Sequence, residues 1–178
     1  RVVGIDTRFR RQLPLASLDH VAKRLLFRLR GDAVFNFGGN FDRSAPGNYG
    51  ELRSDETCVV NFNGTSAQIM SMIDYGANTR RWQYGEVRIN NEAGVTLDAN
   101  VTQATADNSV RGDIRVQNGT FHSGGFSVLL DDGTEFEVAD GASYSTTTTD
   151  ATGGLPAFDG NNGIYNFADN STVIFAAA

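Results

Sequence analysis

The six residues EVRINN at positions 86–91 recur as DIRVQN at positions 113–118, an offset of 27 residues. In both copies apolar residues alternate with polar ones up to an asparagine, which is the pattern of a half-buried strand that runs into a turn. A strand-like unit that recurs at such an offset is typical of solenoids and of arrays of similar small units. The sequence therefore predicts a fold in which short strands stack on near copies of themselves.

A second repeat consists of an apolar residue followed by Asn, Phe and turn-forming residues. It occurs as FNFGGN at 35–40, VNFNGT at 60–65 and YNFADN at 165–170. Beyond Gly31 no stretch sustains the 3.6-residue apolar period of a helix. The strands of a sandwich have no reason to repeat one motif, whereas each coil of a parallel β-helix lies on a near copy of itself. We therefore predict an all-β fold, a right-handed parallel β-helix (β-solenoid), over residues 31–178.

Asn36, Asn61 and Asn166 occupy the same place in the three copies of this repeat. Asn reaches left-handed backbone conformations at low cost, and stacked Asn side chains can hydrogen-bond along a column. The three residues fit such a ladder at a corner of the coil. They fit equally well the outward half of each strand, because alternation alone does not separate the two arrangements.

Charge is unevenly distributed along the chain. Residues 1–30 contain eight Arg or Lys and two Asp, whereas residues 31–178 contain seven Arg and nineteen Asp or Glu. The acidic body repels phosphate backbones, so we expect no nucleic-acid partner. No run approaches 18 apolar residues, so we expect no insertion into a membrane.

The structure of residues 1–30 is ambiguous from periodicity. Apolar residues from Ser17 onward fit one face of an amphipathic helix, while Leu25, Phe27 and Leu29 equally fit a strand. We predict a basic N-terminal cap or a first coil, because an uncovered solenoid end exposes strand edges and core. A helix lying on a membrane is the weaker alternative, since Arg is spread through the segment.

Three stretches carry a resemblance to a known family. In order, VVNFNGTSAQ at 59–68, EVRINNEAGVTLDANVT at 86–102 and VQNGTFHSGG at 116–125 resemble the repeats of large, repetitive surface proteins of Bacteroidota. The resemblance covers roughly residues 31–178 and is interrupted around 69–84. It implies a segment of a very long secreted protein that the type IX secretion machinery exports and that acts as an adhesin or extracellular scaffold.

Motifs for catalysis or metal binding are absent from the sequence. His20 and His122 are far apart, Cys58 has no second Cys, and neither HExxH nor GxSxG occurs. Glu135 and Glu137 alternate with an apolar residue, so they would share a strand face about 7 Å apart, where they could bind Ca²⁺ or act as acid and base. We favour a solvated strand face, and we predict no cofactor, no metal and no enzymatic activity. A polysaccharide-active β-helix enzyme or a glycan-binding module is the alternative.

One cluster combines aromatic and basic residues, and it coincides with the interruption of the family pattern. Aromatic rings and Arg can stack on sugars or anchor a protein partner, and they can also cover the core beneath a loop, which is the interpretation that we favour. The candidate surface-binding residues are Tyr75, Arg80, Arg81, Trp82 and Tyr84.

The last strand-like run, VIF at 173–175, comes where a further coil should follow. Such an end would leave a strand edge that neighbouring repeats or another protein chain must cover. We therefore expect the native polypeptide to be longer and its partners to be neighbouring repeats, other chains or surface glycans.

Overall fold

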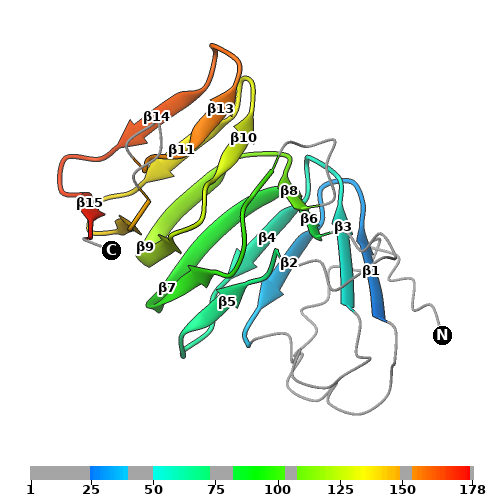
Figure 1. Cartoon of the computed structure of the whole chain (residues 1–178). Coiled ribbons are helices and arrows are strands. Elements are labelled where there is room, and N and C mark those ends of the chain that lie inside the picture. The colour runs from blue at the N-terminus through cyan, green and yellow to red at the C-terminus, as the bar shows by residue number, and fades with distance from the viewer. Residues whose placement is uncertain (1–24, 40–49, 73–81, 103–107, 149–153, 177–178) are drawn as a thin grey trace.

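The computed structural model describes residues 25–39, 50–72, 82–102, 108–148 and 154–176, which wind into a parallel β-solenoid (Figure 1). These residues contain fifteen strands and no helix, and the paired strands all run parallel. The predicted all-β parallel solenoid is confirmed for this part of the chain. Its right-handedness stays a prediction.

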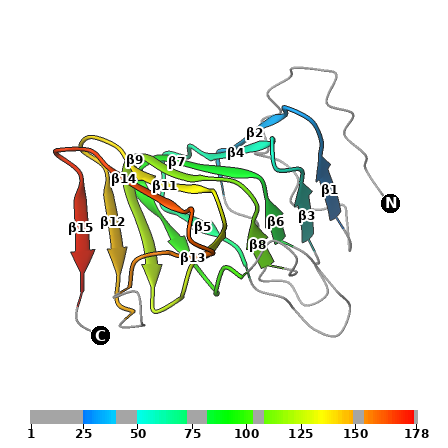
Figure 2. The ribbon, with the colours of Figure 1, turned by 90° about the horizontal axis from the view of Figure 1, so that it is seen from above.

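Within the described residues each turn after the first contributes strands to three sides, and Figure 2 shows the turns from above. Side one holds β1 (Leu25–Leu29), β3 (Gly50–Ser54), β6 (Trp82–Tyr84) and β8 (Asn108–Val110), then β10 (Leu129–Asp131) and β13 (Ala157–Asp159). Side two holds β2 (Val34–Phe37), β4 (Val59–Phe62), β7 (Glu86–Leu97), β9 (Ile114–Gly124), β11 (Glu135–Val138) and β14 (Ile164–Phe167). Side three holds β5 (Gln68–Met70), the second halves of β7 and β9, β12 (Ser143–Thr146) and β15 (Thr172–Phe175).

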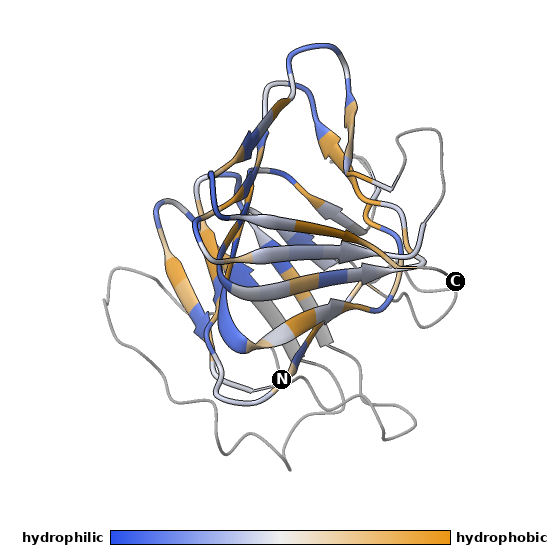
Figure 3. Cartoon of the chain, turned by 90° about the vertical axis from the view of Figure 1, so that its left-hand side faces the viewer, coloured by the Kyte–Doolittle hydropathy of each residue, from blue (hydrophilic) through white to orange (hydrophobic). Residues whose placement is uncertain are grey.

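Inward side chains form aligned rows along side two, because each strand pairs in register with the next. One row is Phe35, Val60, Val87, Ile114, Phe136 and Tyr165, and the other is Phe37, Phe62, Ile89, Val116, Val138 and Phe167. All but the final member of each row are buried. Burial of a Val, Ile or Phe side chain stabilises by about 1.5–3 kcal/mol, so these rows supply much of the folding free energy. Polar residues occupy most of the alternating outward positions, the exceptions being Val34, Val59 and Ile164, and Figure 3 colours the strands by the hydropathy of their residues.

A buried amide closes the corner between sides two and three. The Gln68 side chain donates to the carbonyl oxygens of Phe37 and Gly39, both at 2.9 Å, and accepts from Gly64 N at 2.8 Å and Asn91 Nδ2 at 2.9 Å. All four hydrogen-bonding positions of this amide are satisfied, so its burial carries no unpaired polar group. At this corner the side chains of Gln68 and Asn91 therefore connect successive turns by hydrogen bonds.

The repeated asparagines lie on the outward half of their strands. Asn61 Nδ2 donates to Asn36 Oδ1 at 2.9 Å, so the first two copies also stack as a ladder. In the same register the next positions are Arg88 and Arg115, which end that ladder. Asn166 instead donates to Glu135 Oε1 at 2.9 Å.

Residues 25–29 form a strand, so the part of the helix hypothesis that covers them is wrong. β1 pairs with β3 from Leu25↔Gly50 to Leu29↔Ser54, so β1 belongs to the first turn of the solenoid. The strand pattern of Leu25, Phe27 and Leu29 prevails because pairing with β3 satisfies one edge of its backbone. Residues 1–24 lie outside the described part of the chain.

Candidate functional site

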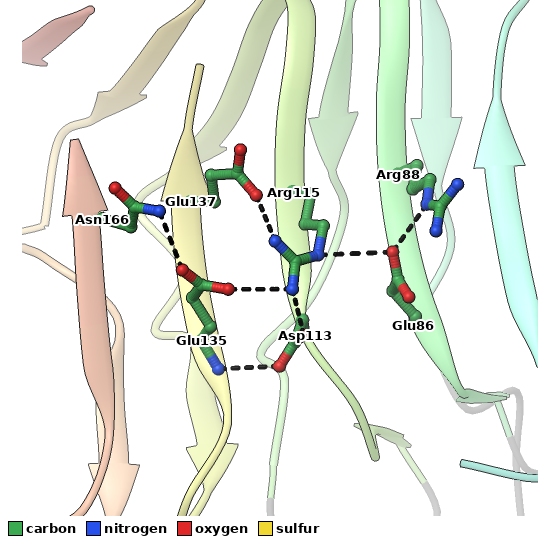
Figure 4. Close-up of polar contacts among 7 residues, drawn as sticks. All are labelled: Glu86, Arg88, Asp113, Arg115, Glu135, Glu137 and Asn166. Atoms are coloured by element: carbon green, nitrogen blue, oxygen red, sulfur yellow. Dashed lines mark hydrogen bonds and ion pairs between the residues drawn. The ribbon is translucent and has the colours of Figure 1, made fainter. Parts of the chain in front are cut away.

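A network of charged and polar side chains lies on the outer face of side two (Figure 4). Its centre is Arg115, whose guanidinium contacts Asp113 at 2.6 Å, Glu135 at 2.8 Å and Glu86 at 3.4 Å, and which also contacts Glu137. We call this the outer network. It comprises Glu86, Arg88, Asp113, Arg115, Glu135, Glu137 and Asn166, which come from β7, β9, β11 and β14 and from the turn before β9.

The register of the strands explains why these groups meet. Arg88 pairs with Arg115, and Arg115 pairs with Glu137, so their outward side chains form one row. Arg88 Nε lies 2.6 Å from Glu86 Oε1. The spacing of an acid two residues before an arginine, in EVR and DIR, is the sequence signal for this network, and it was visible in the repeat at 86–91 and 113–118.

The carboxylates keep Arg115 charged. Burial opposes the charge of the guanidinium, but hydrogen bonds to Glu137 and Asp113 and the nearby Glu135 raise the pKa of Arg115 above its ordinary value. Glu135 and Glu137 do share one outward, half-exposed face, as their alternation predicted. Their oxygens are engaged by Arg115, and Glu135 also accepts from Asn166. This arrangement is an ion-pair network between successive turns.

Replacing Arg115 by methionine should destabilise the protein more than the same change at Arg88. Arg115→Met leaves Glu86, Asp113, Glu135 and Glu137 close together without their shared cation, so we expect a loss of about 1–2 kcal/mol at low salt. Arg88→Met should cost less than about 0.5 kcal/mol, because its ion pair is with Glu86 at a more exposed site. Urea denaturation measures both. Equal losses, or a loss at Arg115 that does not shrink with added salt, would contradict this role of the network.

The candidate surface-binding cluster is only partly described. Trp82 and Tyr84 lie in β6 with buried side chains, and Tyr84 Oη donates to Ser71 O at 3.0 Å. Trp82 and Tyr84 therefore belong to the core, in a strand that lies between β3 and β8 in side one. Tyr75, Arg80 and Arg81 lie outside the described residues, and a binding role for them stays a prediction.

The C-terminal turn has an exposed apolar face. Tyr165 is 42% exposed, Phe167 38% and Phe175 59%, although all three occupy inward positions. Within the described residues β14 pairs with β11 alone, and β15 pairs with β12 alone. We call β14 and β15 the open end. At the other end of side two Phe35 and Phe37 are buried, so among the described inward residues of side two the exposure is confined to the last turn.

Two Asp–Asn contacts hold the loops of the last turn onto the turn below. Asp132 accepts from Asn162 N and Nδ2, both at 2.8 Å, and Asp140 accepts from Asn170 Nδ2 at 2.7 Å. Each pair joins residues 30 positions apart. No strand-like pattern marks these loop positions in the sequence. Only the length of one coil, applied to Asp132 and Asp140, could have predicted their Asn partners.

The Asp132 contact should be sensitive to acid. Hydrogen bonds from Asn162 hold the pKa of the Asp132 carboxyl below its ordinary value. Because the folded state binds this proton less tightly, the contact stabilises the fold above the unfolded pKa of about 3.9 and is lost as the pH falls through the lower folded value. In an NMR titration Asn162→Ala should raise the Asp132 pKa toward its ordinary value, whereas Asn170→Ala should leave it unchanged. An unchanged Asp132 pKa in Asn162→Ala would refute the assignment.

Cys58 is buried, and burial raises the pKa of its thiol, which donates to Gly31 O at 3.0 Å. Among the described residues no group of three or more His, Cys, Asp or Glu has the geometry to hold a metal ion, and no helix could span a membrane. Comparisons with family models, curated proteins and solved structures find no match to this chain.

Proposed function

We propose that the chain is a non-enzymatic structural segment, of the adhesin or scaffold type, of a larger surface protein. The observation that carries the proposal is the open end, where three inward aromatic residues are 38–59% exposed above a turn whose inward residues Phe136, Val138 and Tyr144 are buried. Exposed core side chains beside a bare strand edge are typical of a solenoid that continues or docks, and monomeric proteins rarely leave them uncovered. The proposed partners are neighbouring repeats or other protein chains.

The outer network supports a structural role. Its acids pair with Arg115 and so connect three successive turns of side two, from β7 to β11. A glycan-active enzyme needs a general acid or base whose carboxyl group faces substrate. Glu135 and Glu137 instead face an arginine, which favours the structural role over the enzymatic alternative.

Secretion outside the cell and export by the type IX machinery rest on the resemblance of residues 59–125 to surface-protein repeats. Antibodies against the purified chain should label intact cells, and added protease should remove the label. Labelling that appears only after lysis would overturn the surface location.

The non-enzymatic role is tested with a panel of acidic and neutral polysaccharides. We expect the purified chain to release no more reducing ends or unsaturated products than the Glu135→Gln, Glu137→Gln double variant does. Turnover by the unmodified chain that the double variant loses would replace the structural role with the enzymatic one. Binding to a polysaccharide without turnover supports an adhesin and identifies the surface glycan.

A further inference from the structure

The open end exposes two strand edges as well as apolar side chains. In an inner turn, Val87 N donates to Asp113 O of the next turn toward the open end. In the last turn, Ile164 N and Ala168 N donate in the opposite direction, to Thr134 O and Val138 O of the turn beneath. Backbone groups of alternate residues point to opposite edges of a strand. The amides of Tyr165 and Phe167 in β14, which lie in the register rows of Val87 and Ile89, therefore point toward the edge of β14 that β11 does not occupy.

The same alternation holds in β15. Thr172 N donates to Ala142 O and Ala176 N to Thr146 O, both in the turn below. The amides of Val173 and Phe175 consequently point toward the open edge. The open end thus presents backbone amides toward the open edge on two sides of the coil, beside inward aromatic side chains that are 38–59% exposed.

The chain itself shows what lies on a strand of this pattern. β14 has the sequence IYNF, β2 has VFNF and β4 has VVNF. β4 lies directly on β2 in register, with the Phe62 ring stacked on Phe37 at 5.4 Å and Asn61 bonded to Asn36 at 2.9 Å. The Asn-Phe strand is therefore compatible with a second Asn-Phe strand in parallel register.

We infer that the open end binds a further parallel β-coil whose side-two strand carries the same apolar-aromatic-Asn-Phe pattern. The incoming strand would place an aromatic or apolar residue on Tyr165, Asn on Asn166 and Phe on Phe167, and a second strand would cover β15. This inference rests on the proposed structural function, and it specifies the partner as a following repeat of the same kind.

A second copy of this chain is a poorer occupant in that parallel arrangement. Parallel stacking would need the first turn of the copy to be available, but the inward residues Leu29, Phe35 and Phe37 of that turn are already buried. The last turn, by contrast, exposes Tyr165, Phe167 and Phe175. A following repeat meets no such obstacle.

The test extends the chain by one coil. A second copy of residues 148–176 is joined directly after Ala176, which reproduces the spacing between Glu135 and Ile164. Covalent attachment gives the added coil a high effective concentration, so even weak stacking is detected. The matched control carries Tyr165→Asp and Phe167→Asp in the added copy alone, because buried unpaired carboxylates prevent stacking.

Hydrogen exchange measured by NMR gives the result. The amides of Tyr165, Phe167, Val173 and Phe175 should exchange about 100-fold more slowly in the extended chain than in the chain of 178 residues or in the control. Exchange of Val87 and Val116 should be equal in all three, which establishes that the solenoid body is intact. Equal exchange at the open end in the extended chain and in the control would overturn the inference.

A second result would also overturn it. If the four amides of the unextended chain become protected as its concentration rises, the occupant is a second copy. Neither outcome depends on where the protein is located or on whether it acts on polysaccharides, so failure of the inference is distinguishable from failure of the proposed function.

Discussion

Phe136→Ala should lower the free energy of unfolding by about 3–5 kcal/mol, the largest effect we expect from a single substitution. The Phe136 side chain is fully buried, and its ring lies 5.0 Å from Tyr144 and 6.3 Å from Phe167. Removing it opens a cavity between sides two and three, which the aligned rows above and below restrict from closing. Guanidinium denaturation followed by circular dichroism measures the loss.

The matched control is Phe167→Ala in the next turn, two residues along β14 from Tyr165, which is the register partner of Phe136. Its ring occupies an inward position and is 38% exposed, so water already contacts part of the surface that the substitution removes. We expect less than half the loss seen at Phe136. Losses of equal size would mean that the last turn is covered in the free chain, and the open end would then not exist in solution.

Gly119→Ala should destabilise the fold by about 3 kcal/mol or more, because a steric clash adds to backbone strain. Gly119 has φ of 76° and lies opposite Asn91 at the corner of β9, and a Cβ there would lie 1.9 Å from Asn91 O. The backbone of two turns would have to separate to admit the methyl group.

Gly124→Ala isolates the strain from the clash. Gly124 has φ of 60°, in the same left-handed region, but a Cβ there meets nothing within 4 Å. We expect Gly124→Ala to cost about 1–2 kcal/mol, the strain alone. Thermal unfolding of both variants measures the difference, and equal losses would contradict the close approach of the turns at Gly119.

The stacking of the turns was predictable because stacked strands have similar sequences. The copies at 86–91 and 113–118 do lie side by side, with Val87 on Ile114 and Ile89 on Val116. Inward residues of a coil must resemble those of the coil beneath, so structure of this kind leaves a period in the sequence. The Asn-Phe repeat likewise placed β2 against β4.

The features that escaped prediction depend on single side chains that do not repeat. Gln68 closes the corner with four hydrogen bonds, yet no second Gln marks the column. For Trp82 and Tyr84 the sequence favoured a core-covering role but left a binding surface open, because aromatic residues beside Arg occur both in binding loops and in core strands. The burial of both side chains in β6, which pairs with β3 and β8, shows that they belong to the core.

We propose that the chain is a structural segment whose open end is covered by a following repeat. The most direct measurement is the mass of the native protein that carries this sequence, isolated from the cell surface with antibodies against the chain. We expect a polypeptide well above 19.2 kDa, in which further strand repeats follow the described turns. A native protein of 19.2 kDa that is monomeric and unfolds cooperatively would contradict it.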